Sequence, residues 1–346
     1  MERVIDGWNG ADLRDCTSSR IKELKCDSLK RSLADLSGQS IFGRTSSRYW
    51  MQVYAYSYDY MECQAWPSAA QARAAVKKRL PSELPVITEQ EESLLRRVIL
   101  FGGTTPLFSD DEIFTADSLV RRLWCSCVLN NDGQLLLKLA DVLLKPIVEC
   151  VSDEQYHLKR TKIYALSATL HSMVYLYGLL YTEPAITHLN ENLFEKDTAE
   201  NRRLLKRFMM AEFDYSRDSQ GNLILLHSGL AYPERIAASV SNAQYQATDY
   251  TREMIIGGMS ELLREEEAAA GILRSELSYA LQPGYNPTVM ANDIKILIKQ
   301  GATHEQLYDL IRDKLAVRMT PRLENALIRA EKETVRWQNA TSGRLN

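Results

Sequence analysis

The chain has 346 residues, with 45% hydrophobic and 25% charged residues, which is an ordinary composition for a globular protein of two or three domains. Its formal net charge of −3 excludes a general electrostatic attraction to nucleic acid, so a nucleic-acid site would have to be local. The segment Met1 to Cys16 contains Glu2, Asp6 and Asp12 and no apolar run, so we expect no secretory signal.

The cysteines and the longest apolar run both favour a cytoplasmic protein outside the membrane. No two cysteines have C-x-x-C spacing, which predicts reduced, buried thiols and no metal site. The run Ile163 to Leu180 includes Ser167, Thr169 and His171, and it is shorter than the roughly 20 apolar residues of a membrane span. We therefore expect a buried core helix there. The cysteines are at positions 16, 26, 63, 125, 127 and 150.

The N-terminal 85 residues are predicted to be a helical region. Residues 11–36 have mostly helical spacing of apolar side chains. Residues 48–62 fit both a strand, because tyrosines alternate from Tyr54 to Tyr60, and a helix, which we favour. The tyrosines would form a packed face of that helix; a stacking surface for bases is the alternative. Residues 68–79 favour a helix ending before Pro81, and residues 81–85 are typical of a linker.

A helix–helix–hairpin order follows in residues 86–152. An apolar helix containing Leu94 and Val98 stops at Gly102-Gly103, and a second helix is expected from Asp117 to about Cys125. Asp110-Asp111-Glu112 is interpreted as a solvated loop. Residues 127–129 and 135–137 then read as hairpin arms around a turn of Asn, Asp and Gly, residues that tolerate left-handed backbone geometry.

The same order returns in residues 153–245. Ile163 to Leu180 is the apolar helix, and Asp197 with Glu200 resembles a capping box before a helix over 202–211. A hairpin follows from Phe213, with arms at 213–215 and 223–226. Gly133 and Gly221 are 88 positions apart, and each precedes an amide residue, Leu, an aliphatic residue and Leu. This order is typical of a winged-helix module, so the sequence predicts two of them.

Residues 246–346 are predicted to be wholly helical. The segment 282–287, with two prolines and a glycine, separates a long charged helix from a short amphipathic one that ends at Gly301. Thr303 with Gln306 is a capping box for the next helix. Thr320-Pro321 has the cap and first-turn proline of another helix, which continues through Leu327.

The search for chemistry favours a non-catalytic protein. No phosphate-binding, dinucleotide-binding, zinc-protease or serine-hydrolase motif is present, and the five histidines are far apart. No catalytic residue, metal or cofactor is therefore assigned. The strongest functional pattern is basic: a helix immediately before a winged-helix hairpin can enter the major groove, where Arg and Lys contact phosphates and bases. The candidate nucleic-acid residues are Arg202, Arg203, Lys206 and Arg207 on that helix and Arg217 in the hairpin; Arg121 and Arg122 correspond to them in the first module.

Two segments resemble known families. The three helical patterns at 294–301, 303–315 and 320–327 resemble helical modules of bacterial helicase-associated proteins. Residues 160–237, with Tyr177-Gly178-Leu179-Leu180 before two helices and a hairpin, are similar to units of bacterial tandem winged-helix and helix-turn-helix proteins. These resemblances imply DNA binding or partner docking, and they supply no catalytic residue.

The sequence thus predicts a mainly α fold of several helical modules, two of them winged-helix-like with a small β-hairpin each. The expected domains are 1–85, 86–152, 153–245 and 246–346. The expected function is nucleic-acid binding or regulation through the basic helix and wing. The alternative is a protein-interaction scaffold whose winged modules dock a partner protein and bind no DNA. The two readings differ in partner, DNA or protein, and the oligomeric state is not predicted.

Overall fold

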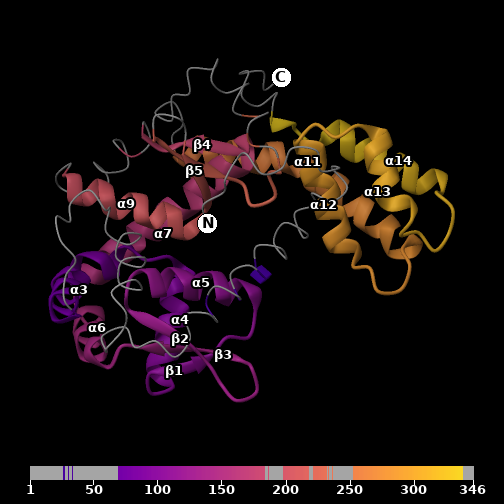
Figure 1. Ribbon diagram of the computed structural model, residues 1–346. Coiled ribbons are helices and arrows are strands. Elements are labelled where there is room, and N and C mark those ends of the chain that lie inside the picture. Colours follow the sequence, from indigo (N-terminus) through magenta and orange to yellow (C-terminus); the bar gives the residue numbers. More distant parts are fainter. Residues whose placement is uncertain are drawn as a thin grey trace. The chain divides into compact units, whose positions relative to one another are not determined.

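The computed structural model describes a mainly α protein with two small three-stranded antiparallel sheets, which confirms the predicted fold class (Figure 1). The described residues are 26, 27, 30, 33, 69–183, 186, 198–217, 221–231, 233, 236 and 252–337. The predictions for 1–25 and for the tyrosine-rich segment 48–62 lie outside them. The chain divides into two compact units, of which unit 1 comprises 1–22, 166–202 and 213–346, and unit 2 comprises 23–165 and 203–212.

The first module begins with a helix whose ends have clear local causes. In α4 (Glu89–Leu100), Thr88 accepts a hydrogen bond from Glu91 N, and the Glu91 side chain accepts one from Thr88 N, which completes a capping box. The helix ends where Gly102 and Gly103 adopt φ angles of 72° and 98°, as the glycine pair predicted.

The second helix of this module begins earlier than the sequence suggested. Asp110, Asp111 and Glu112 form the first turn of α5 (Asp110–Arg121), so their interpretation as a loop was wrong. Ser109 caps the helix by accepting a hydrogen bond from Glu112 N, and three carboxylates in the first turn complement the helix dipole. The predicted end near Cys125 was also wrong: α5 ends at Arg121, and Cys125 is the first residue of a strand.

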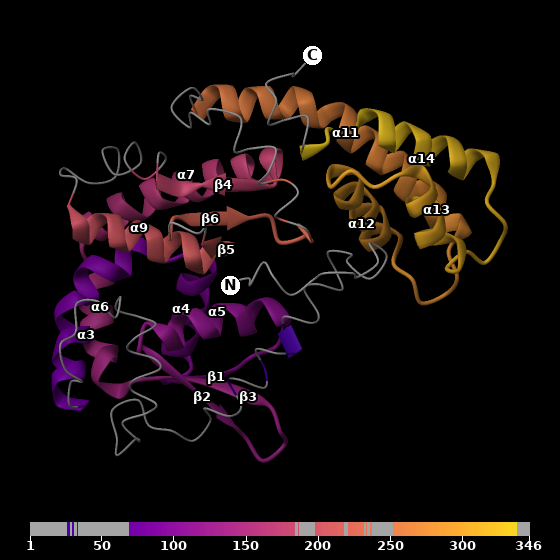
Figure 2. The ribbon, with the colours of Figure 1, turned by 45° about the horizontal axis from the view of Figure 1, so that its top comes forward.

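The sheet of the first module has three strands rather than a hairpin alone. It contains β1 (Thr104–Pro106), β2 (Cys125–Leu129) and β3 (Leu135–Leu139) in the order β1-β3-β2. α4 and α5 lie together beside this sheet (Figure 2). Cys127 of β2 and Leu137 of β3 are both buried in the core. The helix α6 (Leu144–Val151) follows through the short turn η5 (Asp141–Leu143).

The second module repeats this order. Its elements are α7 (Glu154–Tyr177), β4 (Leu179–Tyr181), α9 (Ala199–Glu212), β5 (Asp214–Arg217) and β6 (Leu223–Leu226). The sheet order is β4-β6-β5. Leu179 and Leu180 were predicted as helix and are strand, because Gly178 breaks the helix at φ 76°. Asn201 N donates to Thr198, so the cap of α9 is one residue later than the Asp197 predicted.

The two modules share strand register as well as order. Leu135 pairs with Leu129, and the residues 88 positions later, Leu223 and Arg217, pair in the same way. The two sheets also share a hydrogen bond from a backbone amide at the end of the third strand to the carbonyl of the glycine that precedes the first strand. The donor is the residue after the last one that pairs with the first strand of each sheet: Leu139 N donates to Gly103 O in the first module, and His227 N donates to Gly178 O in the second, at 2.8 Å in each.

The predicted linker at 81–85 is part of the folded core. Pro81 lies inside α3 (Ala69–Glu83), and the turn η4 (Leu84–Val86) buries all three of its residues. The helix expected to end before Pro81 therefore continues to Glu83. Burial of Leu84, Pro85 and Val86 explains the difference, because their apolar side chains gain more by packing than an exposed linker would.

The C-terminal helices form a separate core. They are α11 (Arg252–Ala280), α12 (Pro287–Lys299), α13 (His304–Arg312) and α14 (Pro321–Glu333), and α11 lies beside α14 (Figure 2). The caps predicted at Thr303 and Thr320 are both present, and Thr303 and Gln306 form the full capping box. Buried Leu277, Ile294 and Leu327 belong to the cluster that holds these helices together.

Candidate functional site

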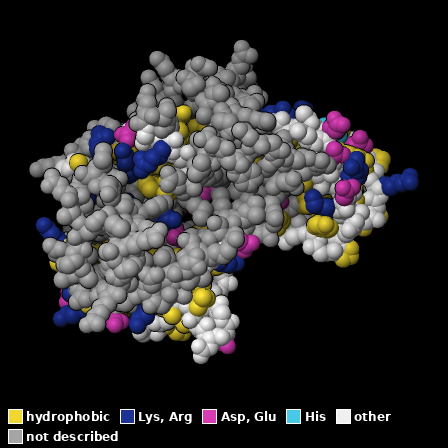
Figure 3. Space-filling model, viewed as in Figure 1, with side chains coloured by type: hydrophobic (Ala, Val, Ile, Leu, Met, Phe, Trp, Pro, Cys, Tyr) yellow, Lys and Arg dark blue, Asp and Glu magenta, His cyan; other side chains and the backbone are white. Residues whose placement is uncertain are grey.

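The predicted basic residues lie on the elements where a winged-helix protein would have its recognition helix and wing. Arg202, Arg203, Lys206 and Arg207 are partly exposed on α9, and Arg217 is exposed at the end of β5. Lys and Arg side chains gather in the area of α9 on the face shown in Figure 3. The first four therefore share one helix, and the fifth lies next to the hairpin turn.

Two of these cations, Arg207 and Arg202, form ion pairs within the protein. Arg207 Nη1 lies 2.6 Å from Glu83 Oε1, and this pair is largely buried, with only 2% of the Glu83 side chain exposed. Arg202 Nη1 lies 3.9 Å from Glu183 Oε2 in a more exposed pair. Arg217 donates from Nη1 to Gly221 O across the turn, at 3.1 Å. Arg207 is thus a packing residue, and Arg217 is the exposed cation next to the hairpin turn.

A second surface, which the sequence reasoning missed, is an apolar groove in unit 2 with a volume of about 220 Å³. We call it the α4–α6 groove. Its walls are the helices α4 and α6, its floor includes η4, and Tyr156 of α7 lies at one end. The lining residues are Leu84, Ile87, Glu92, Leu95, Arg96, Ile99, Leu100, Ile147, Val148, Val151 and Tyr156.

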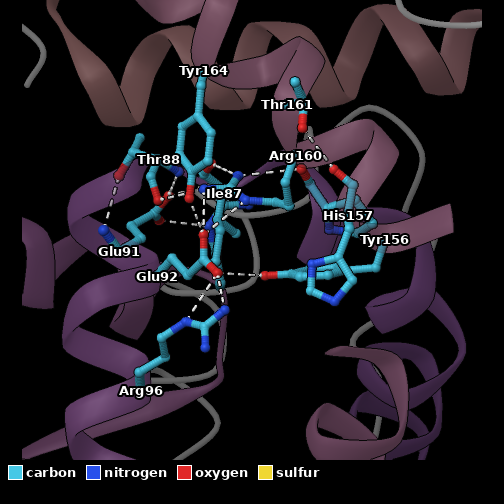
Figure 4. Close-up of polar contacts among 12 residues, drawn as sticks. Ile87, Thr88, Glu91, Glu92, Arg96, Tyr156, His157, Arg160, Thr161 and Tyr164 are labelled. Carbon is cyan, nitrogen blue, oxygen red and sulfur yellow. Dashed lines mark hydrogen bonds and ion pairs between the residues drawn. The ribbon is translucent and has the colours of Figure 1, made fainter. Parts of the chain in front are cut away.

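The polar end of the groove is built around the Glu92 carboxylate (Figure 4). Tyr156 Oη donates to it at 3.0 Å and Tyr164 Oη at 2.5 Å. Arg96 Nη2 approaches at 2.6 Å and Arg160 Nη2 at 2.8 Å. Four side chains from α4 and α7 therefore converge on one carboxylate and join the α4 wall of the groove to α7.

The charge of Glu92 is stable down to strongly acidic pH. Burial alone would raise its pKa, but the hydrogen bonds from Tyr164 and Arg96 and the charge of Arg160 outweigh burial and lower the pKa to about 2. Glu91, the preceding residue, is fully buried and pairs with Arg122 at 2.8 Å, and that charge likewise lowers its pKa despite burial. Carboxylates that are fully hydrogen-bonded and have a low pKa suit a rigid structural support better than acid–base catalysis.

The other end of the groove is apolar and exposed. Leu100, in the last turn of α4, has 84% of its surface exposed, and the adjacent Phe101 has 69%. Val148 lies on the opposite wall and is 45% exposed. Leu100 and Phe101 are consecutive apolar residues immediately before Gly102-Gly103, a local sign of apolar surface at the end of α4. The α6 wall has no such local sign, so the groove as a whole does not follow from the sequence.

No family model, curated protein or solved structure matches the chain. Within the part of the chain that the structure describes, no group of three or more His, Cys, Asp or Glu side chains could hold a metal ion. None of the described helices has the length and apolar character needed to cross a membrane.

Proposed function

We propose that the chain is a non-catalytic protein-interaction scaffold whose first winged-helix-like module docks a partner protein in the α4–α6 groove. The observation that carries this proposal is the exposure of Leu100 at the mouth of an apolar groove whose other wall is Val148. Burying such surface against a partner gains roughly 25 cal/mol for each Å² of apolar area removed from water. The Glu92 cluster supports the proposal, because it fixes the α4 wall against α7 before a partner arrives.

The test is affinity capture from the native lysate with a matched pair of variants. Val148→Glu places a charge on the groove wall, and Ile328→Glu places the same charge on α14, where Ile328 is 49% exposed. The wild-type chain and Ile328→Glu should retain a specific partner, and Val148→Glu should lose it. A partner captured equally well by all three proteins would exclude the groove as the docking surface.

Nucleic-acid binding through the second module is the other candidate function. It is favoured by Arg217, which is exposed beside the turn of a hairpin that follows the basic helix α9. Duplex DNA should then bind at low salt, and its affinity should fall steeply as salt rises, because each phosphate contact releases a counterion. Arg203→Ala with Lys206→Ala should weaken this binding. Arg207 is left unchanged in that test, since its ion pair with Glu83 supports packing.

The remaining expectations belong with these proposals. The resemblance to bacterial tandem winged-helix proteins supports both candidates and separates neither. A cytoplasmic location is part of the proposal, and fractionation of the native cells tests it.

A further inference from the structure

The dimensions of the α4–α6 groove match two turns of a helix. Its lining on α4 runs from Glu92 to Leu100, which is about 12 Å at 1.5 Å per residue. Side chains at positions i and i+7 of a partner helix are about 10.5 Å apart along its axis. A cavity of about 150 Å³ holds benzene, so a groove of about 220 Å³ has room for one or two aliphatic side chains. A third would rest on exposed Leu100.

The secondary structure around the groove favours a helical ligand over an extended one. Every lining residue belongs to a helix, a helical turn or the residues flanking them, and none belongs to β1, β2 or β3. An extended peptide is recognised mainly by hydrogen bonds to an exposed strand edge, which the groove lacks. An amphipathic helix needs only an apolar groove, because its own backbone groups are already satisfied.

The charge at the polar end favours an acidic ligand. Glu92 is one carboxylate facing two guanidinium groups, those of Arg96 and Arg160, so this cluster carries one excess positive charge. Arg160 is buried, whereas 59% of the Arg96 side chain is exposed. Arg96 uses Nε and Nη2 for Glu92, and no described residue accepts a hydrogen bond from its Nη1. A carboxylate at the groove end would complement this charge.

We propose that the α4–α6 groove receives an amphipathic helix of a partner protein, with apolar side chains at i, i+4 and i+7 and an Asp or Glu side chain that pairs with Arg96. This inference rests on the proposed scaffold function and names the chemistry of its partner. The partner helix replaces solvent over Ile99, Leu100 and Val148, and its carboxylate fixes the direction in which it lies.

The probes are two synthetic fluorescein-labelled peptides of about four turns on an Ala-rich background. Both carry Leu at i, i+4 and i+7; one has Glu one turn before the first Leu, and the other has Gln there. Fluorescence anisotropy with the full-length chain should show roughly 3-fold to 5-fold tighter binding of the Glu peptide, the effect of a partly exposed charge pair. Equal affinity for the two peptides would overturn the assignment of Arg96.

Three variants separate the apolar and electrostatic contributions. Arg96→Gln should bind the two peptides equally, with the affinity that the Gln peptide has for the wild-type chain. Val148→Glu should weaken both peptides at least 10-fold, and Ile328→Glu should change neither. Thermal unfolding followed by circular dichroism must show that all three variants remain folded. Preserved discrimination in Arg96→Gln, or unchanged binding in Val148→Glu, would contradict the inference.

The two proposals fail in different ways. If Val148→Glu loses the captured partner but neither peptide binds the wild-type chain, docking in the groove stands and the helical, acidic ligand is wrong. If octanoate binds in the groove and the peptides do not, the site takes a small amphiphile, which also overturns the inference. If Val148→Glu weakens the binding of both peptides but still captures the partner, the ligand chemistry stands and the scaffold function fails.

Discussion

At the residue scale, Glu91 and Glu92 show why adjacent identical residues cannot be interpreted from sequence alone. Both lie in the first turn of α4, where acidic residues are expected for the helix dipole. Long-range partners give them separate environments: Arg122 for Glu91, and Arg160 with two tyrosines for Glu92. These partners are tens of residues away in the chain, so no local pattern could predict the cluster or the groove wall that it supports.

The low pKa of Glu92 predicts acid sensitivity. Its pKa falls from the ordinary value of 4.5 to about 2 on folding, so ionised Glu92 stabilises the fold fully above about pH 4.5. That contribution is lost as pH falls from about 4.5 to about 2. Urea unfolding at pH 7, 4 and 3 should show decreasing stability for the wild-type chain and a shallower decrease for Glu92→Gln. A pH dependence identical in both proteins would contradict the assignment.

Gly103 and Gly178 occupy equivalent positions in the two modules but should respond differently to substitution. Both have positive φ, so either Gly→Ala change costs about 1 kcal/mol in backbone strain. A Cβ at Gly178 would also lie 2.6 Å from the Trp337 ring, whereas one at Gly103 meets no atom within 4 Å. Gly178→Ala should therefore lower the melting temperature clearly more than Gly103→Ala in thermal unfolding. Equal effects would mean that Trp337 does not pack there.

At the element scale, sequence reasoning succeeded where local chemistry decides the structure. The caps at Thr303 and Thr320 and the hairpin turn at Gly133 depend on neighbouring residues only, and all three were predicted. It failed for β1 and β4, because strands of three residues have too few positions to show an alternating pattern. Pairing with β3 and β6 defines these strands, and pairing is a long-range property.

Two basic residues of α9, Arg207 and Lys206, should differ in how much they contribute to stability. Arg207→Ala should destabilise the protein by about 3 kcal/mol, because it leaves the buried Glu83 carboxylate without its partner. Lys206→Ala, on the same helix and only partly exposed, should cost less than about 1 kcal/mol. Chemical denaturation of the two variants measures this difference. If Arg207→Ala is as neutral as Lys206→Ala, the ion pair with Glu83 does not support packing.

At the scale of the whole molecule, the repeated order of elements was predictable and its functional meaning was not. The spacing of 88 residues between Gly133 and Gly221 follows from a strand register that both modules share. The candidate site on α9 could be selected from sequence because it is a local run of cations. The groove could not, because its walls come from α4 and α6, which are separated by a sheet in the chain order.

Trp337 provides a test of the division into two units. Its indole Nε1 donates to Tyr175 O at 2.9 Å, and its ring packs on Gly178 and His227, all within unit 1. Trp337→Ala should remove about 3 to 5 kcal/mol of stability from that unit, the usual cost of deleting a buried aromatic side chain. Hydrogen exchange should then accelerate at the amides of β6 in unit 1 and remain unchanged at those of β3 in unit 2. Equal acceleration in both sheets would show that the two units unfold as one cooperative body.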